Sequence, residues 1–300
     1  MKERFVRFAL RLLEAIPLSI VAFFLEGIML IVWAVDRKHR RIARINLKIA
    51  FPEIDEKEAR RIIRYCYMRI GTSAAEFLHI PKMDDRYIRE HFRIEGLEYI
   101  EKSKREGRPI LVMTGHFGNW ELSSHLYSMQ VAPMAFIVKQ LRSPILDAIV
   151  TERRQFRGNT VIKQTESAKQ VVRFLHKKVM VGILIDQNVD RHRGVLVELF
   201  GRKTYTTDGI ARLALALQAA IHPGFIFRNP ENKFCHTLWF GPAVPIDPDI
   251  PKEEEIIRLT RRCNQELEKV IQRAPDQWMW FQPRWKNRGS DEPDVYKEGT

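Results

Sequence analysis

The 300-residue sequence has only three cysteines, Cys66, Cys235 and Cys263, and they form neither a close pair nor a CxxC motif. An odd, dispersed set argues against a disulfide framework and against a structural zinc site. The nine histidines also lack the spacing of a metal-ligand set, so we expect neither a metal nor another cofactor. These absences favour a folded part that resides in a reducing, cytoplasmic setting.

Internal repeats and low-complexity linkers are also missing from residues 1–285. The length fits one large globular domain, or one domain with a helical attachment. An apolar share of 45% and a charged share of 29% are ordinary for a folded protein. We expect a hydrophobic, membrane-associating helix at 1–35, an α/β domain at 36–285 and a polar, mobile tail at 286–300.

Basic residues are in excess, with 50 Lys and Arg against 37 Asp and Glu, a net charge of +13 and a pI near 9.8. Such a field favours anionic partners: nucleic acid, an acidic membrane surface, a phosphorylated ligand or an acidic carrier protein. Charge alone does not choose among them. A nucleic-acid-binding protein would carry aromatic residues interleaved with the basic ones, and no such recognition motif is visible. We therefore expect no nucleic acid partner.

Residues 18–35 are almost wholly apolar, and Glu26 is the one interruption. The run is just long enough to cross a hydrocarbon core, but a carboxylate at mid-span is costly there. Three interpretations stay open: a spanning anchor, a helix in the interface, or a buried hydrophobic helix. The sequence lacks a small-residue cleavage site after the run, which argues against a signal peptide. The basic cluster at 36–44 would hold that end of the run on the cytoplasmic side and draw the folded domain to an anionic membrane surface.

Short apolar runs alternate with longer amphipathic segments along the rest of the chain. Residues 55–80 have helical spacing, and Asp55 and Glu58 stand at the spacing of a capping box. Further helices are predicted at 144–157, 166–178, 207–220 (capped by Thr207 or Asp208) and 252–273, and buried strands at 110–114, 134–138, 179–185 and 225–227. This alternation predicts an α/β fold, with a mostly parallel central sheet flanked by helices and an N-terminal hydrophobic helix.

The stretch GHFGNWE at 115–121 follows a predicted strand, at the edge where parallel sheets bind ligands. His116 and Glu121 would not share a face of a regular helix, so they meet only if His116 lies in a turn, which Gly115 and Gly118 permit. A carboxylate on one imidazole nitrogen would let the other take a proton from a hydroxyl. Because neither a serine elbow nor a cysteine is near, the acceptor's own hydroxyl would be the nucleophile. On spacing alone, a structural His–Glu pair is the more frequent outcome.

GHFGNWE resembles the HxxxxD/E motif of the glycerolipid acyltransferase superfamily, and most closely the branch containing the late lipid A acyltransferases, which transfer lauroyl or myristoyl groups. Further segments resemble those of this branch in the same order and cover most of residues 40–288. They are RINLKIAFPE at 44–53, ERRQFRGN at 152–159, ILIDQNVDRHRGVLVELFGRKTYTTDGIARLA at 183–214 and DQWMWFQPRWKNR at 276–288.

The resemblance implies a role for several residues. His116 resembles the family's general base and Glu121 its orienting partner, while Arg153 and Asp186 match a catalytic arginine and the acidic residue of a D-Q motif. Arg154 is interpreted as surface charge. Weaker candidates for contact with a lipid headgroup are Gln187, Arg228, Arg284 and Lys286.

The implied reaction is transfer of an acyl chain from acyl carrier protein or acyl-CoA to a hydroxyl of a lipid A precursor, a phosphorylated glycolipid. Glu198, Gln282 and Pro283 depart from the family pattern, which leaves the acceptor and the chain length open. The alternatives are an acyltransferase of another membrane glycolipid or phospholipid and, in a different class, a basic nucleic-acid-binding protein or an inactive membrane scaffold. The intact His116, Glu121, Arg153 and Asp186 argue against a scaffold.

Overall fold

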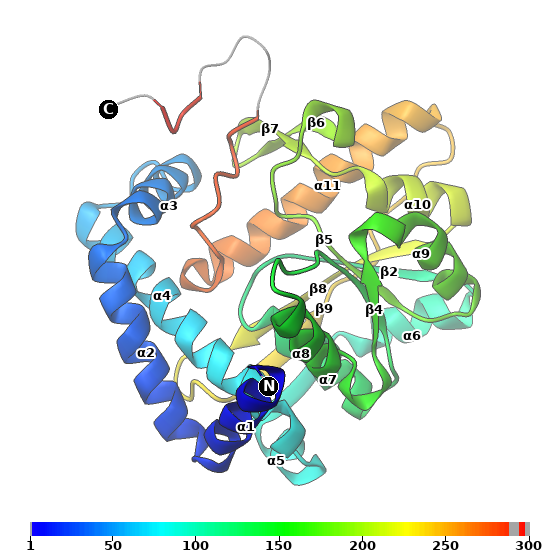
Figure 1. The fold of residues 1–300 in the computed structure, drawn as a ribbon. Helices are drawn as coiled ribbons and strands as arrows, with labels where there is room; N and C mark the ends of the chain where they lie inside the picture. Colours follow the sequence, from blue (N-terminus) through cyan, green and yellow to red (C-terminus); the bar gives the residue numbers. More distant parts are fainter. Residues whose placement is uncertain (1, 288–293, 298–300) are drawn as a thin grey trace.

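The computed structural model describes residues 2–287 and 294–297, and its centre is a seven-stranded sheet (Figure 1). The strand order is β1-β9-β8-β2-β5-β3-β4, and within the described residues every pairing in this sheet is parallel except that of β8 with β9. The strands are β1 (Phe92–Glu95), β2 (Ile110–Thr114), β3 (Ala135–Val138), β4 (Thr160–Lys163), β5 (Val181–Leu184), β8 (Ala220–Arg228) and β9 (His236–Phe240). The predicted α/β class is confirmed.

Helices cover both faces of the sheet. Residues of α5 (Asp85–His91), α6 (Leu97–Arg105) and α7 (Trp120–Gln130) form one buried cluster with the face that carries Val112. Residues of α9 (Ser167–His176), α10 (Gly209–Leu217) and α11 (Lys252–Arg273) form a second with the face that carries Met113. The small antiparallel hairpin of β6 (Val195–Leu199) and β7 (Arg202–Thr206) lies beside α11.

The long periodic segments were predicted well. Helix α4 spans Glu56–His79, and the Asp55 carboxylate accepts a hydrogen bond from the Glu58 amide (2.7 Å), as the capping pattern predicted. Helix α11 spans the predicted 252–273, and α8 (Pro144–Arg154) and α10 are shorter than expected. Asp208 occupies the N-cap position of α10, but its carboxylate pairs with Arg212 instead of a backbone amide.

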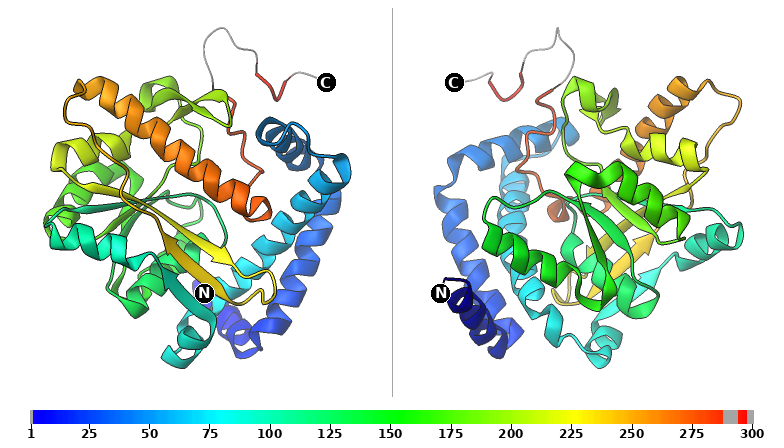
Figure 2. Two further views of the ribbon diagram at one scale, coloured as in Figure 1. Left: turned by 180° about the vertical axis from the view of Figure 1, so that it is seen from behind. Right: turned by 45° about the vertical axis from the view of Figure 1, so that its right-hand side comes forward.

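The N-terminal helices are α1 (Lys2–Ala15), α2 (Leu18–Val35) and α3 (Arg37–Ala50), and α2 packs along α4. In both views of Figure 2, α2 lies at the outer edge and α4 lies between it and the sheet. Helix α2 is long and apolar enough to cross a membrane, by length and composition alone. Phe23 is 70% exposed and Ile31 66%, so the interpretation as a fully buried helix is wrong.

The contacts of Glu26 explain how a carboxylate is tolerated in the apolar run. It faces the folded domain, where it accepts a hydrogen bond from the Thr72 hydroxyl (2.6 Å) and pairs with Lys233 (2.7 Å). Opposite it stands Gly71 of α4, where an added Cβ would lie 2.7 Å from the backbone of Leu25 and Glu26. The glycine therefore allows the two helices to approach closely.

The predicted mobile tail, 286–300, lies partly outside the described residues, which exclude 288–293 and 298–300. The described part of it makes specific contacts. The Tyr296 hydroxyl donates to the side-chain oxygen of Asn46 on α3 (2.5 Å) and accepts from the Trp285 amide (3.0 Å). Residues 294–297 thus dock on the folded domain.

Candidate active site

The turn from β2 to α7 carries His116, and it is fixed by its neighbours. Gly118 has φ of 59°, and an added Cβ would lie 1.9 Å from the carbonyl oxygen of Ile226, so only glycine fits there. The C-terminal segment clamps the turn: the Gly118 amide donates to the Gln277 carbonyl (2.8 Å) and the Met279 amide to the His116 carbonyl (3.0 Å). The backbone around the histidine is therefore held from two sides.

The carboxylate next to the imidazole is that of Asp186. His116 Nδ1 lies 2.9 Å from Asp186 Oδ1, and the His116 amide donates to Oδ2 (2.8 Å). The indole N–H of Trp278 donates to the same oxygen (3.0 Å). Because a carboxylate only accepts hydrogen bonds, Nδ1 carries a proton, which leaves Nε2 as the basic nitrogen of the neutral ring.

The charges of this pair reinforce each other. Burial disfavours protonation of His116 most strongly, but the charge and hydrogen bond of Asp186, with a contribution from Glu121, outweigh it and raise the pKa of His116 above 6.5. Burial would raise the pKa of Asp186, yet the neighbouring His116 and the donated hydrogen bonds lower it. Asp186 is therefore ionised at neutral pH and stabilises an imidazolium.

Glu121 was predicted to orient the imidazole of His116, but it does not contact Nδ1, which Asp186 binds instead. Its carboxylate forms a two-point ion pair with Arg154 of α8: Nε lies 2.8 Å from Oε2 and Nη2 lies 2.5 Å from Oε1. Glu121 stands on the first turn of α7, which faces α8. Asp186 follows β5, which pairs in parallel with β2, so the two strand ends bring it to His116.

The two adjacent arginines of α8 differ from their predicted positions: Arg154, and not Arg153, lies beside the site. Arg153 donates to the Leu78 carbonyl (3.1 Å) and pairs with Glu14 of α1, away from the imidazole. Arg154, interpreted from the sequence as surface charge, lines the cavity with His116. Consecutive helical residues point about 100° apart, so only one of the two can face the site.

Of the four weaker candidates for headgroup contact, two are accessible and two are buried. Gln187 lines the cavity and Lys286 is exposed. Arg284 is buried under the β6–β7 hairpin, where it donates to the hydroxyls of Thr204 (3.0 Å) and Thr206 (2.7 Å) and burial lowers its pKa to about 10. Arg228 is also buried. Neither buried arginine is placed for headgroup contact, because its side chain is enclosed by the protein.

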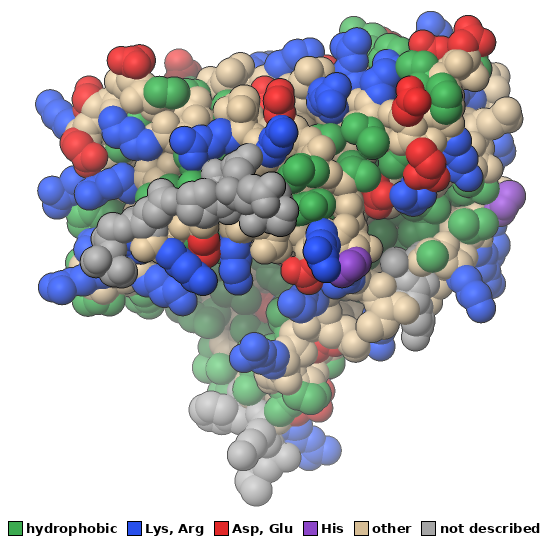
Figure 3. All heavy atoms as spheres, turned by 90° about the horizontal axis from the view of Figure 1, so that it is seen from above, with side chains coloured by type: hydrophobic (Ala, Val, Ile, Leu, Met, Phe, Trp, Pro, Cys, Tyr) green, Lys and Arg blue, Asp and Glu red, His purple; other side chains and the backbone are tan. Residues whose placement is uncertain are grey.

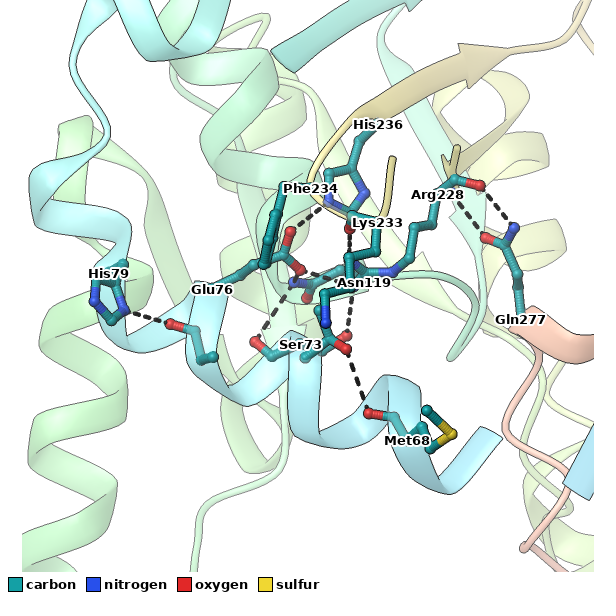
Figure 4. A network of polar contacts seen from close by, with 12 residues as sticks. Met68, Ser73, Glu76, His79, Asn119, Arg228, Lys233, Phe234, His236 and Gln277 are labelled. Carbon is teal, nitrogen blue, oxygen red and sulfur yellow. Dashed lines mark hydrogen bonds and ion pairs between the residues drawn. The ribbon is translucent and has the colours of Figure 1, made fainter. Parts of the chain in front are cut away.

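Arg228 belongs to a polar network that sequence reasoning missed (Figure 4). At its centre the buried Glu76 of α4 accepts from Arg228 (2.7 Å), His236 (2.6 Å) and the side-chain amide of Asn119 (2.9 Å). Burial opposes ionisation of Glu76, but the charges and hydrogen bonds of its partners lower its pKa to about 2. Asn119 immediately precedes α7, so this carboxylate fixes the helix that carries Glu121.

A cavity of about 1090 Å³ opens beside His116. Trp120, Glu121 and Arg154 surround its polar end. Its apolar lining comes from the sheet, from α7 and from residues of α9 and α10, and it includes Val112, Tyr127, Met134, Phe136, Gly182 and Phe240. The volume and apolar lining suit a long hydrocarbon chain. Within residues 2–287 and 294–297, no group of three or more His, Cys, Asp or Glu side chains could hold a metal ion.

Known proteins are similar to this sequence over most of its length. The family described as "Bacterial lipid A biosynthesis acyltransferase" matches residues 3–287. A lipid A biosynthesis acyltransferase of Haemophilus influenzae is 25% identical over 260 residues, which cover 87% of this chain and 79% of the relative. In Escherichia coli K12, a lipid A biosynthesis lauroyltransferase is 26% identical over 261 residues and a palmitoleoyltransferase 24% over 264, each covering 87% of this chain and 83% of the relative.

A histidine held by a carboxylate at the polar end of an apolar cavity is a site suited to acyl transfer. The chain belongs to the bacterial lipid A biosynthesis acyltransferases, and it is therefore an acyltransferase.

Alanine at Gly118 should destabilise the protein strongly, because its Cβ would collide with the Ile226 carbonyl. Gly107 is the matched control, since it also has positive φ (70°) but open space around its Cβ position. Denaturant unfolding should show a loss of about 1 kcal/mol for Gly107→Ala and of about 3 kcal/mol or more for Gly118→Ala. Equal losses would mean that the turn relaxes and is not clamped as described.

Proposed function

We propose that the protein transfers a fatty acyl chain from the thioester of acyl carrier protein or CoA to a hydroxyl of a lipid A precursor. The observation that carries this proposal is the His116–Asp186 pair at the polar end of the apolar cavity. The family supplies the reaction class, and the geometry supports a proton-transfer role for the imidazole.

In the proposed reaction, His116 Nε2 takes the proton of the acceptor hydroxyl as its oxygen attacks the thioester carbonyl carbon. The C–O bond forms, the C–S bond breaks, and the imidazolium returns the proton to the departing thiolate. Asp186 fixes the tautomer that leaves Nε2 basic and stabilises the imidazolium while it exists. No acyl-enzyme is needed, because the acceptor is itself the nucleophile.

Arg154 is proposed to stabilise negative charge near the reacting carbonyl or on a phosphate of the acceptor. Two of its nitrogens bind Glu121, and Nη1 makes no hydrogen bond within the described part of the chain. Glu121 would then act by orienting Arg154 and by adding negative charge near His116. A two-point ion pair fixes the guanidinium plane, and a fixed donor at a developing oxyanion is effective in catalysis.

The acyl chain is proposed to occupy the apolar part of the cavity under α7. The relatives named above transfer different chains by name, lauroyl and palmitoleoyl, so the family alone does not fix the length. Gly182 has no side chain, so the sheet surface is open at this position. The Met134 side chain lies directly over it, because an added Cβ at Gly182 would be 3.1 Å from the Met134 methyl carbon. The chain length should therefore depend on these two residues.

The names of the family and of its relatives support a lipid A precursor as the acceptor. Gln282, which departs from the family pattern, lines the cavity, so another membrane glycolipid stays the second candidate. A membrane-bound acceptor fits the location that we propose for the protein, at the inner membrane with the catalytic domain facing the cytoplasm. The exposed apolar α2 and the basic α3 that follows it support that location.

The neighbouring arginines provide a test of the site. Arg154→Lys keeps the charge but loses the two-point pair, and we expect turnover to fall about 10²–10³-fold. Arg153→Lys is the matched control on the same helix, and its turnover should stay within about threefold of the wild type, because Arg153 contacts α1 instead of the cavity. Steady-state acyl transfer in detergent measures both. A larger loss for Arg153→Lys would contradict the assignment.

Lipid A from cells that lack this protein tests the proposed function. Mass spectrometry should show one secondary acyl chain missing, and the wild-type gene should restore it. Loss of proton transfer lowers rates about 10²–10⁴-fold, so His116→Ala should not restore the chain. His176→Ala, which changes an exposed histidine at the end of α9, should restore it. An unchanged lipid A profile with an altered glycolipid would favour the second candidate.

A further inference from the structure

Helices α1 and α2 present an apolar surface that the folded domain leaves uncovered. The exposed large hydrophobic residues of the described chain are concentrated there: Phe8, Leu12, Leu13, Ile16, Ile20, Phe23, Phe24, Ile28, Ile31 and Val35. We call this set the outer apolar face. It extends from Phe8 of α1 to the last residue of α2, and on α1 it is flanked by exposed charged residues such as Arg4 and Arg11. A contiguous apolar surface of this kind marks a binding site.

The opposite side of α2 packs against the folded domain. Val21 and Ala22 are buried, Gly71 lets α4 approach the backbone at Leu25, and Glu26 pairs with Thr72 and Lys233. Helix α4 in turn packs its other side into the main core through residues such as Ile62 and Ile63. A bilayer that surrounded α2 on all sides would have to displace α4 and leave Glu26 without its partners.

The C-terminal end of α2 has the features of a helix end at a membrane surface. The guanidinium groups of Arg40 and Arg60 lie 5.5 and 5.3 Å from the ring centre of Trp33. Arg37 and Lys38 follow on the exposed surface of α3. Figure 3 shows Lys and Arg side chains over this part of the molecule. Trp33 itself packs against the main core, and the arginines lie over its ring. Cations are drawn to anionic lipids, so this end would lie among headgroups.

From these contacts we infer that α1 and α2 lie in the plane of one leaflet of an anionic bilayer, with the outer apolar face in the acyl region, and that neither helix crosses the membrane. The inference deepens the proposed function, and it rests on it for the identity of the membrane-bound acceptor. The occupant of the face is a lipid bilayer, because the apolar strip is bordered by cations at its end.

The ties between α1 and α8 give this arrangement a consequence for the active site. Arg7 pairs with Glu152 (2.6 Å), and Glu14 pairs with Arg153. Arg154, the next residue, lines the cavity. A helix embedded in the leaflet is thus joined to α8, which contributes Arg154 to the cavity lining. The acceptor hydroxyl could reach His116 while its lipid chains stay in the same leaflet.

Sidedness in sealed membrane vesicles tests the inference on the full-length protein. An epitope tag is placed before residue 1, and a cysteine is introduced at exposed Lys286 on the catalytic domain. In-plane helices predict that protease removes the tag from the same side on which an impermeant thiol reagent labels the cysteine. Removal only from the opposite side, with full digestion in detergent as the control, would show that α2 crosses the membrane and would overturn the inference.

A second measurement tests the outer apolar face itself. The double change Phe23→Glu and Phe24→Glu should reduce flotation with vesicles of phosphatidylglycerol and phosphatidylethanolamine at least tenfold. Ile257→Glu is the matched control, because Ile257 is exposed on α11, and it should float like the wild type. Transfer to detergent-solubilised acceptor should be unchanged in both, which separates failure of docking from failure of the proposed function. Unchanged flotation of the double variant would contradict the inference.

Discussion

The Asp186 carboxylate is buried and ionised, and both of its oxygens are used by donors from other parts of the chain. Without those donors, an ionised carboxylate at this depth would be too costly to keep. They can be supplied only if β2 and β5 lie side by side, the turn after β2 folds back, and Trp278 closes over it. The arrangement of the sheet and the C-terminal segment is thus coupled to the protonation of one imidazole.

Around this pair, successive contacts hold the rest of the site. The backbone of the C-terminal segment grips the turn at His116 and Gly118. Gln277, in the same segment, exchanges two hydrogen bonds with the backbone of Arg228 (2.8 and 2.9 Å), and Arg228 binds Glu76. From Glu76 the network continues through Asn119 to the start of α7. Lys233, whose carbonyl accepts from Arg228, also pairs with Glu26 of α2. Continuous contacts therefore join α2 to the turn at His116.

The sequence predicted the elements whose signal is local. Helices α4 and α11 have sustained apolar periodicity, and β2 and β5 are continuous apolar runs, so all four were found. Strand β8 was recognised only at 225–227, because Pro223 and Gly224 interrupt it, and such residues usually exclude a central strand. Here the interruption is tolerated: the proline lacks only a donor, and its carbonyl accepts from the Gly241 amide (2.8 Å). The turn at Phe200 and Gly201 was also missed, since phenylalanine rarely takes positive φ.

In the site, the sequence pattern located His116, but the carboxylate that it suggested for the ring, that of Glu121, is not the one in contact with it. Glu121 is five positions away and looked like the partner, whereas Asp186 is 70 positions away and reaches the ring through parallel strand pairing. No spacing rule connects residues that only the sheet brings together. The resemblance pointed to Arg153, whereas Arg154 lines the cavity, because the side of α8 that faces the cavity is fixed only by packing. The sequence did not identify Glu76 as a functional residue, because a glutamate in an amphipathic helix is expected on its exposed side. Its burial becomes evident only when its partners are known.

The central claim is that Asp186, more than Glu121, sets the protonation of His116, and nitrogen NMR of the labelled histidine tests it directly. The wild-type protein should titrate above pH 6.5. Asp186→Asn removes the charge that opposes the effect of burial, so the pKa of His116 should fall. Glu121→Gln removes a more distant charge, and it should lower the pKa by a smaller amount. A larger fall in Glu121→Gln than in Asp186→Asn would contradict the account.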